Sequence, residues 1–284
     1  MDYWQILILA IIQGAAELLP VSSSAHVIVA AKLMRADTSA PEFVFLLVML
    51  HTGTMLAVIC YFWSRWKRLL STSAAGRLGG AGWLRLVLLV VIATGCTGVV
   101  GLALKWIIER ATQAPIEALF KNLWLIAGSL LTVGIFIILA GRRSTQKEVS
   151  TISAWSAVWM GIIQGLCLPF RGFSRSGATI SMALCRGIAR PLAEDFSFAL
   201  AVVLTPPVLA YSVYHHLRKA EWPSDTGLAE LLLPGLVGMG FSFLAGLLAL
   251  RLLSSVLEMG RWHYFGYYCI AASAGVLAVA LAGV

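Results

Sequence analysis

The sequence predicts an all-α polytopic membrane protein with six transmembrane helices and two re-entrant helical hairpins, arranged as an inverted-topology repeat. Three observations predict this class. The 284 residues are 60% hydrophobic and only 12% charged, whereas a soluble domain carries about 25% charged residues. Six apolar runs are long enough to cross a bilayer, which takes about 20 residues. A polar motif also occurs twice, offset by 151 residues.

The six predicted spans are the long apolar runs of the chain. They cover Phe43–Trp63, Trp83–Leu104, Leu123–Ala140, Phe196–His216, Ala229–Leu250 and Tyr264–Gly283. Residues that disfavour a regular helix lie at matching places in the first and fourth runs, at Thr52-Gly53-Thr54 and Thr205-Pro206-Pro207. We therefore predict a local break in each of these two helices.

Two further apolar regions are interrupted by polar turns. Trp4–Leu19 ends at Pro20–Ser24, and the short apolar piece His26–Met34 follows. Trp155–Leu168 ends at Pro169–Ser176, and Thr179–Cys185 follows. Non-helical backbone at membrane depth persists only where it is buried in protein or lines a wet cavity. Each region is therefore predicted to form a re-entrant hairpin of two half-helices.

The two halves of the chain have the same predicted order, one hairpin followed by three spans. They cover approximately residues 1–150 and 151–284 of a single integral membrane domain, residues 1–284. Because three is odd, the second half must enter the membrane from the side opposite to the first. Inverted repeats with broken helices place a binding site where the two halves meet. The sequence therefore predicts that the two polar turns approach each other.

The distribution of Lys and Arg predicts the orientation. One side of the predicted membrane receives twelve basic residues and the other receives seven, and the richer side is expected to be cytoplasmic. Both termini then face the periplasm, and the first hairpin opens toward it. Although the formal net charge is +8, the basic residues lie in short loops between apolar runs. They indicate topology and give no support for nucleic-acid binding.

The repeated motif supplies the candidate site. Its first copy runs from Gln13-Gly14 through Glu17 and Ser22–Ser24 to His26, and its second runs from Gln164-Gly165 to Thr179. Ionisable groups in apolar surroundings are energetically costly and therefore mark function. A carboxylate, hydroxyls, an imidazole and a guanidinium together suit a phosphate ester or anhydride. The guanidinium can donate two hydrogen bonds to phosphate oxygens, and the N-terminus of a half-helix adds backbone N–H donors.

Several of these residues also have structural interpretations. Ser22–Ser24 could cap the half-helix that follows them, and Arg175 could simply neutralise Glu17. We interpret His51, in the first span, as a structural or supporting histidine. Gln13 and Gln164 are expected to bond the broken backbone of the hairpins. His26 can transfer protons near neutral pH, and Ser23, three residues earlier, is expected to be its partner.

The two motifs resemble the signatures of a known family. The segment from Gln13 to His26 closely resembles the first signature of the undecaprenyl-diphosphate phosphatase family, also called the bacitracin-resistance family, and Gly172–Thr179 resembles the second. The resemblance implies a bacterial inner-membrane enzyme that removes the terminal phosphate from the C55 isoprenyl diphosphate, with membrane lipids around it. Carried over by position, the residues that correspond to the family's catalytic groups are Glu17, Ser23, His26 and Arg175.

The sequence departs from the family's pattern at three positions. The family has either Glu or Gln at position 13, and Gln13 leaves one carboxylate fewer. Ala25 stands where Gly is usual, and Arg171 stands where Pro is common. The family suggests a divalent cation, Mg²⁺ or Ca²⁺, beside Glu17, which a single carboxylate supports only weakly.

We therefore predict a lipid-diphosphate phosphatase of the bacterial inner (plasma) membrane. Either Ser23 attacks the phosphate with His26 as base, or His26 attacks and Glu17 orients it; the sequence leaves both open. Further residues are predicted to bind the substrate: Gln13, Ser22, Ser24, Arg171, Ser174, Ser176 and Thr179. The alternative function is an isoprenyl-phosphate transporter or flippase that uses the same site, because inverted repeats are also a transporter architecture.

Overall fold

The computed structural model describes residues 2–36, 40–72, 82–143, 149–217 and 228–282. Within these ranges the chain forms α-helices joined by short connections, and a lone bridge between Val149 and Ile188 is the β-pairing described there. The helices are α1 (Tyr3–Leu18), α2 (Ser23–Leu33), α3 (Pro41–Thr72), α4 (Gly82–Thr112), α5 (Leu123–Arg143), α6 (Ala154–Cys167), α7 (Arg175–Cys185), α8 (Arg190–Leu217), α9 (Leu228–Glu258) and α10 (His263–Leu281); the 3₁₀ helix η2 (Ile116–Lys121) precedes α5.

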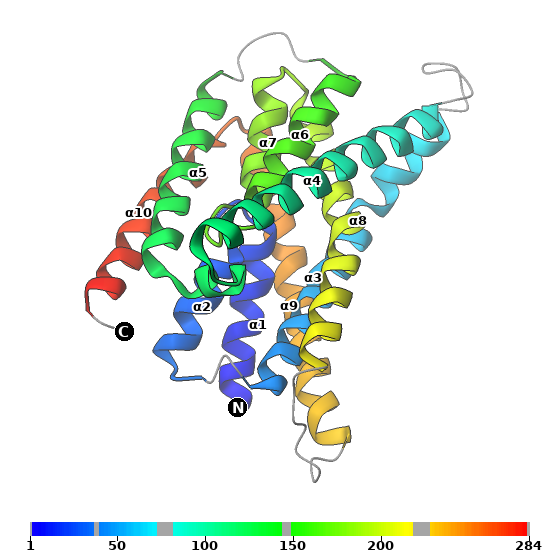
Figure 1. Cartoon of the computed structure of the whole chain (residues 1–284). Coiled ribbons are helices and arrows are strands. Elements are labelled where there is room, and N and C mark those ends of the chain that lie inside the picture. Colours follow the sequence, from blue (N-terminus) through cyan, green and yellow to red (C-terminus); the bar gives the residue numbers. More distant parts are fainter. Residues whose placement is uncertain (1, 37–39, 73–81, 144–148, 218–227, 283–284) are drawn as a thin grey trace.

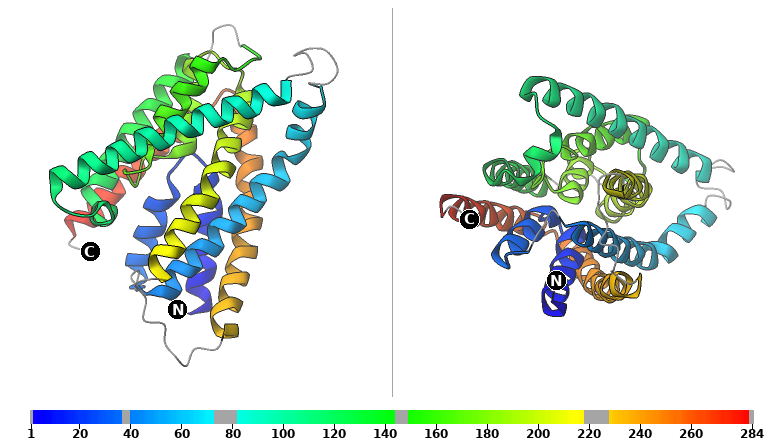
Figure 2. Two further views of the ribbon diagram at one scale, coloured as in Figure 1. Left: turned by 45° about the vertical axis from the view of Figure 1, so that its right-hand side comes forward. Right: turned by 60° about the horizontal axis from the view of Figure 1, so that its bottom comes forward.

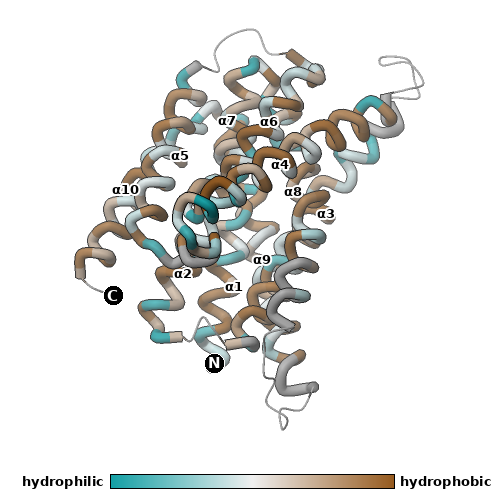
Figure 3. The backbone as a smooth tube through the Cα atoms, viewed as in Figure 1, coloured by the Kyte–Doolittle hydropathy of each residue, from teal (hydrophilic) through white to brown (hydrophobic). Residues whose placement is uncertain are grey.

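Six helices are long and apolar enough to cross a membrane, as predicted. These are α3, α4, α5, α8, α9 and α10. Their apolar side chains lie on the outside of the molecule as well as inside it. On α4, Val99 and Leu102 are each 71% exposed, and this helix is hydrophobic along most of its length (Figure 3). Such a surface suits a hydrocarbon environment, which confirms the predicted class of protein.

The predicted breaks in two of the spans are wrong. The α3 helix runs through Thr52-Gly53-Thr54, and α8 runs through Pro206 and Pro207. In α3, the hydroxyls of Thr52 and Thr54 donate to the backbone carbonyls of Val48 and His51, so neither competes with the helix. The helices therefore stay continuous, and both Thr-containing segments pass the candidate site.

Four shorter helices form two hairpins at opposite ends of the molecule. The α1–α2 hairpin lies at the end where the chain starts, and α6–α7 lies at the other end (Figure 1). The α2 and α7 helices have 11 residues each, about 16 Å at 1.5 Å per residue, which is too short to cross a hydrocarbon core of about 30 Å. The turns of both hairpins therefore point into the middle of the fold.

The packing of the hairpins explains the repeated Gln-Gly pair. A Cβ atom placed on Gly14 of α1 would lie 2.5 Å from the carbonyl oxygen of Ser242 in α9. A Cβ atom on Gly165 of α6 would lie 2.7 Å from the Cβ of Val100 in α4. Small residues at helix contacts let backbones approach closely inside membranes. Each copy of the motif therefore seats the first helix of its hairpin against a long helix of the other half of the chain.

The long helices complete the frame around the hairpins. The α5 helix packs against α10, and α3 packs against α9 and α8; Figure 2 shows these neighbours from two further directions. On α3, Arg65 lies 3.1 Å from the carboxylate of Glu194 and 2.9 Å from that of Asp195, both on α8. This ion-pair cluster joins α3 to α8, the two helices whose middle parts flank the hairpin turns.

Candidate active site

The turns of the two hairpins touch, as predicted. The Nη2 atom of Arg175, at the start of α7, donates to Oε1 of Glu17, near the end of α1, at 2.8 Å. The hydroxyl of Ser176 lies 3.4 Å from the carbonyl oxygen of Leu19, and a Cβ on Gly177 would lie 3.2 Å from Pro20. The repeated motif thus forms one site rather than two.

Glu17 is the centre of this site. Its Oε2 atom accepts a hydrogen bond of 2.5 Å from the hydroxyl of Ser23 and one of 3.2 Å from the amide of Gln13. Gln13 lies one helical turn before Glu17, so the two side chains share a face of α1. The expectation that Gln13 bonds broken backbone is wrong, because this amide orients the carboxylate. Gln164, its counterpart, donates to the hydroxyl of Thr97 on α4 at 3.1 Å.

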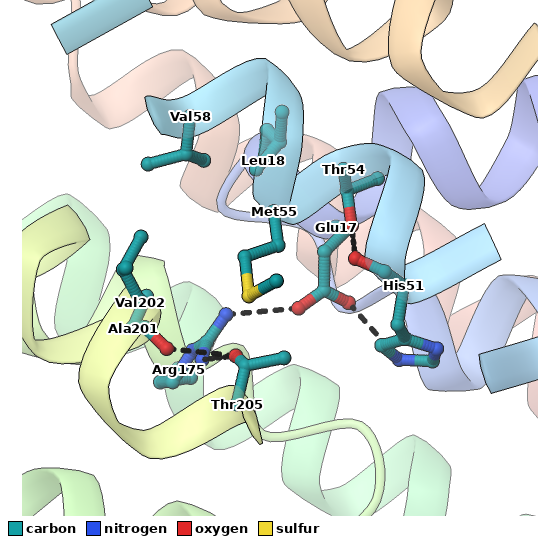
Figure 4. A pocket seen from close by; sticks show the side chains of 10 residues that line it. All are labelled: Glu17, Leu18, His51, Thr54, Met55, Val58, Arg175, Ala201, Val202 and Thr205. Atoms are coloured by element: carbon teal, nitrogen blue, oxygen red, sulfur yellow. Dashed lines mark hydrogen bonds and ion pairs between the residues drawn. The ribbon is translucent and has the colours of Figure 1, made fainter. Parts of the chain in front are cut away.

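A small pocket lies beside this centre, between α1, α3, α7 and α8 (Figure 4). Its polar lining is Glu17, His51, Thr54, Arg175 and Thr205, and its apolar lining is Leu18, Met55, Val58, Ala201 and Val202. The side chains of Glu17, Arg175 and His51 are 15%, 21% and 27% exposed. These charged and ionisable groups are therefore reachable from the pocket while apolar walls shield them from bulk water.

His51, interpreted from the sequence as a structural or supporting histidine, lines the pocket. Its Nε2 atom lies 3.7 Å from Oε2 of Glu17, and its Nδ1 atom lies 2.7 Å from the backbone carbonyl oxygen of Leu47. A usable signal was present: His51, Thr54 and Met55 are spaced three and four residues apart, which places them on one face of a helix. All three line the pocket.

His26 does not pair with Ser23 in the part of the chain that the structure describes. Its Nδ1 atom lies 2.8 Å from the carbonyl oxygen of Ser22, and its Nε2 atom lies 2.8 Å from the hydroxyl of Tyr268 on α10. The two rings stack at 5.7 Å. The expected partnership is therefore wrong, because His26 faces α10 while Ser23 faces the end of α1.

The first turn is held in an unusual backbone conformation. Ser22 has φ of 67° and ψ of 94°, and its side chain makes no capping bond to α2. Its hydroxyl instead lies 3.3 Å from that of Ser24. Non-glycine residues in the left-handed region are uncommon and cluster at functional sites. Ser22 therefore does not cap α2 through its side chain. The turn instead brings the hydroxyl of Ser23 to the carboxylate of Glu17.

The second turn is ordered by its own hydroxyls. The Ser174 side chain caps α7 by accepting a hydrogen bond from the backbone N–H of Gly177 at 3.2 Å. Ser176 lies 3.4 Å from Ser174. Thr179 is fully buried, and its hydroxyl is hydrogen-bonded to that of Ser197 on α8. Thr179 thus braces α7 against α8, outside the lining of the pocket.

Arg171 also lies outside the pocket lining, although it belongs to the same turn. Its guanidinium stacks over the ring of Phe120 in η2, 4.4 Å from the ring centroid. Cation–π contacts of this kind fix the direction of an Arg side chain. Arg171 therefore ties the second turn to the connection before α5.

The residues of the site do not fit a dedicated protein-built cation site. Glu17 is the carboxylate that lines the pocket, and both its oxygens already accept hydrogen bonds. Among the described residues, no group of three or more His, Cys, Asp or Glu side chains could hold a metal ion. Mg²⁺ and Ca²⁺ need several oxygen ligands, which this donor set does not supply.

The fold and the site together define a class: polytopic helical membrane proteins with a carboxylate–guanidinium–hydroxyl centre between two short hairpins. The comparisons with known proteins place the chain more narrowly. Residues 6–275 match the model of the family described as bacitracin resistance protein BacA. The chain belongs to this family.

Curated relatives are similar over nearly their whole length. The chain is 50% identical to "Undecaprenyl-diphosphatase 2" of Acinetobacter baylyi, covering 99% of each protein. It is 33% identical to "Undecaprenyl-diphosphatase 1" of Burkholderia pseudomallei, covering 96% of this chain and 95% of the relative. It is 30% identical to "Undecaprenyl-diphosphatase" of Halothermothrix orenii over all of both.

Proposed function

We propose that this protein is an integral membrane phosphatase that hydrolyses undecaprenyl diphosphate to undecaprenyl phosphate and inorganic phosphate. The observation that carries the proposal is the contact of Glu17 with both Arg175 and Ser23. It joins an anion-binding group, a nucleophile and a base at one centre, of which Glu17 and Arg175 line the pocket. The names of the relatives, each similar over nearly the full length, support the same activity.

Arg175 binds the diphosphate in this proposal. Its guanidinium is planar and stays charged, so it can contact two phosphate oxygens at once. The start of α7 adds the positive end of a helix, and the buried hydroxyls of Ser174 and Ser176 order this turn. In the free protein Glu17 contacts Nη2 of Arg175, so a diphosphate that binds this atom competes with the carboxylate.

Ser23 is the nucleophile that the geometry favours. Its hydroxyl already donates to Oε2 of Glu17, so Glu17 can take the proton as the Ser23 oxygen bonds to the terminal phosphorus. The bond from that phosphorus to the bridging oxygen breaks, and its electron pair leaves with undecaprenyl phosphate. Water then attacks the phosphoserine, which releases phosphate and restores the hydroxyl.

The second route, direct attack by His26, has less support. The Nε2 atom of His26 is engaged by the hydroxyl of Tyr268, and its Nδ1 atom by a carbonyl oxygen. Attack through Nε2 would require the ring to give up its contact with Tyr268. We assign His26 and Tyr268 instead to holding the first turn, through which they position Ser23.

A divalent cation stays a prediction. If Mg²⁺ or Ca²⁺ takes part, the diphosphate has to supply most of the oxygen ligands, with Glu17 as the protein group nearest to them. Such an ion would neutralise phosphate charge. No step of the proposed reaction depends on it, because Arg175 and Glu17 suffice for binding and proton transfer.

We further propose that the chain lies in the bacterial inner membrane as two inverted repeats, residues 1–150 and 151–284, with re-entrant hairpins. The opposite placement of the two hairpins supports this. The packing does so too, because α1 of the first half packs on α9 of the second, and α6 of the second half packs on α4 of the first. The side with more Lys and Arg is cytoplasmic. Both termini and the opening of the first hairpin then face the periplasm.

Phosphate release in detergent tests the proposed function. The purified full-length protein is incubated with undecaprenyl diphosphate, with and without Mg²⁺ or Ca²⁺, and inorganic phosphate is measured. The proposal predicts turnover of the diphosphate, whereas a flippase acting only as a carrier would release none, because detergent has no two sides. A folded protein without phosphate release under all these conditions would overturn the assignment.

A further inference from the structure

The carboxylate of Glu17 lies between two nitrogen-bearing side chains on different walls of the pocket. Its Oε1 atom is bonded to Arg175 of α7 at 2.8 Å, and its Oε2 atom faces Nε2 of His51 on α3 at 3.7 Å (Figure 4). The first contact is a full hydrogen bond, whereas the second is too long for one. The carboxylate is thus held by Arg175 and has a second partner within reach.

The orientation of the His51 ring is fixed from its other side. Its Nδ1 atom lies 2.7 Å from the carbonyl oxygen of Leu47, and a carbonyl only accepts, so Nδ1 carries a hydrogen. Nε2 faces a carboxylate oxygen, which is also an acceptor. The contact with Leu47 therefore fixes the ring with its Nε2 atom directed at Glu17.

Diphosphate binding changes the surroundings of this carboxylate. Under the proposed function, the substrate takes Arg175 away from Glu17, and the carboxylate would then lose its strongest partner in a shielded pocket. Glu17 would keep the neutral donors Ser23 and Gln13, and a shielded carboxylate that loses its ion pair is costly. A movement of about 1 Å brings Oε2 to hydrogen-bonding distance from Nε2, and Arg175 and His51 are the side chains with a nitrogen atom in the lining of the described pocket.

We propose that His51 is a positioning residue that holds Glu17 when the diphosphate takes Arg175. This inference rests on the proposed function and deepens it. Holding Oε2 also keeps that oxygen beside the Ser23 hydroxyl, from which it accepts the proton. His51 thus acts through Glu17 and not on the substrate, and without His51 the carboxylate competes more strongly with the diphosphate for Arg175.

The experiment measures binding of inorganic diphosphate to the purified full-length protein by calorimetry. We compare His51→Gln with His51→Asn, because both carry the same amide but only Gln reaches as far as Nε2. His51→Asn should raise the dissociation constant for diphosphate about tenfold, within the usual range of coupling between sites. The constant of His51→Gln should stay within about threefold of that of the unmodified protein. His51→Leu repeats the loss without an amide, and Thr52→Val on the adjacent position of α3 serves as the matched control.

A Glu17→Gln background supplies the readout that a merely structural role would not move. A neutral amide does not hold Arg175 as an ion pair, so His51→Asn should change the dissociation constant no further in that background. The inference is overturned if His51→Asn binds diphosphate as tightly as the unmodified protein, if its defect persists beside Glu17→Gln, or if the unmodified protein binds no diphosphate.

Failure of the proposed function has a different outcome. The unmodified protein could bind diphosphate with the expected dependence on His51 and yet release no phosphate from the lipid substrate. That result would contradict the phosphatase function and support the role of His51 in holding Glu17. Turnover of the lipid substrate with no effect of His51→Asn on binding, KM or kcat would support the phosphatase function and contradict the positioning role of His51.

Discussion

Glu17 and Arg175 form a 2.8 Å ion pair although they are 158 positions apart in the sequence. Each stands at the turn of one hairpin, and the two hairpins come from opposite ends of the molecule (Figure 1). The pair therefore forms only when both halves of the chain are packed together. It places the anion-binding group and the base of the proposed reaction in direct contact before substrate arrives.

The first prediction concerns the guanidinium. Arg175→Ala should lower kcat/KM at least about a hundredfold, because losing one donor to the developing charge has an effect of that size. Arg175→Lys should recover only part of this, since an ammonium lacks the planar fork. Phosphate release by the purified variants measures both. Near-normal turnover by Arg175→Ala would exclude this residue from phosphate binding.

The second prediction concerns the nucleophile. Ser23→Ala should lose most of the activity, whereas Ser24→Ala should lose much less, because Ser23 alone of the two donates to Glu17 in the structure. Rapid acid quench of the unmodified protein with labelled lipid diphosphate should trap an acid-stable phosphoserine. An acid-labile phosphohistidine that survives in base would transfer the role to His26.

The third prediction concerns stability. Gly14→Ala should destabilise the protein by about 1–3 kcal/mol, the usual range for overpacking, because its Cβ would meet the Ser242 carbonyl oxygen at 2.5 Å. Gly165→Ala should act similarly against Val100. Thermal unfolding in detergent measures the change.

Two other glycines provide the matched controls. Gly95 and Gly98 lie in α4 with no atom within 4 Å of an added Cβ. Their Ala variants should leave the unfolding midpoint unchanged or raise it, because Ala is favoured over Gly in a helix by about 1 kcal/mol. Equal losses at all four positions would show that the close helix contacts are not the cause.

The fourth prediction concerns sidedness. In a variant whose five native cysteines are replaced, a cysteine at the exposed Thr112 should react with an impermeant thiol reagent on intact cells. A cysteine at the exposed Ser150 should react only after permeabilisation. Positions Ser39 and Ser224 should label like Thr112, and Ser73 like Ser150; these three lie outside the described residues.

The labelling pattern also tests the repeat. The reverse pattern would overturn the orientation inferred from the basic residues. Labelling of Thr112 and Ser150 from the same side would contradict the inverted arrangement, because the predicted topology separates the two positions by the α5 span.

The class of protein and the helices that cross the membrane were predictable because they depend on composition along the chain. An apolar run of about 20 residues has the length needed to span a bilayer as a helix, and six such runs are found as long helices. The repeat of Gln-Gly, Leu-Pro and the following polar residues likewise indicated that two turns would meet. The breaks predicted at Thr52-Gly53-Thr54 and Thr205-Pro206-Pro207 are not found: the hydroxyls of Thr54 and Thr205 donate to carbonyls of their own helices, and α8 continues through both prolines.

The sequence by itself determined the six spans, the two hairpins and the residue types of the site. Only the tertiary structure decided which side chains face one another. Ser23 and His26 stand three residues apart on one short helix, yet one contacts Glu17 and the other contacts Tyr268. His51 enters the pocket in place of His26. The reason is physical: hydropathy is local along the chain, whereas the rotation of each helix about its axis is set by close contacts between distant segments, such as Gly14 against Ser242.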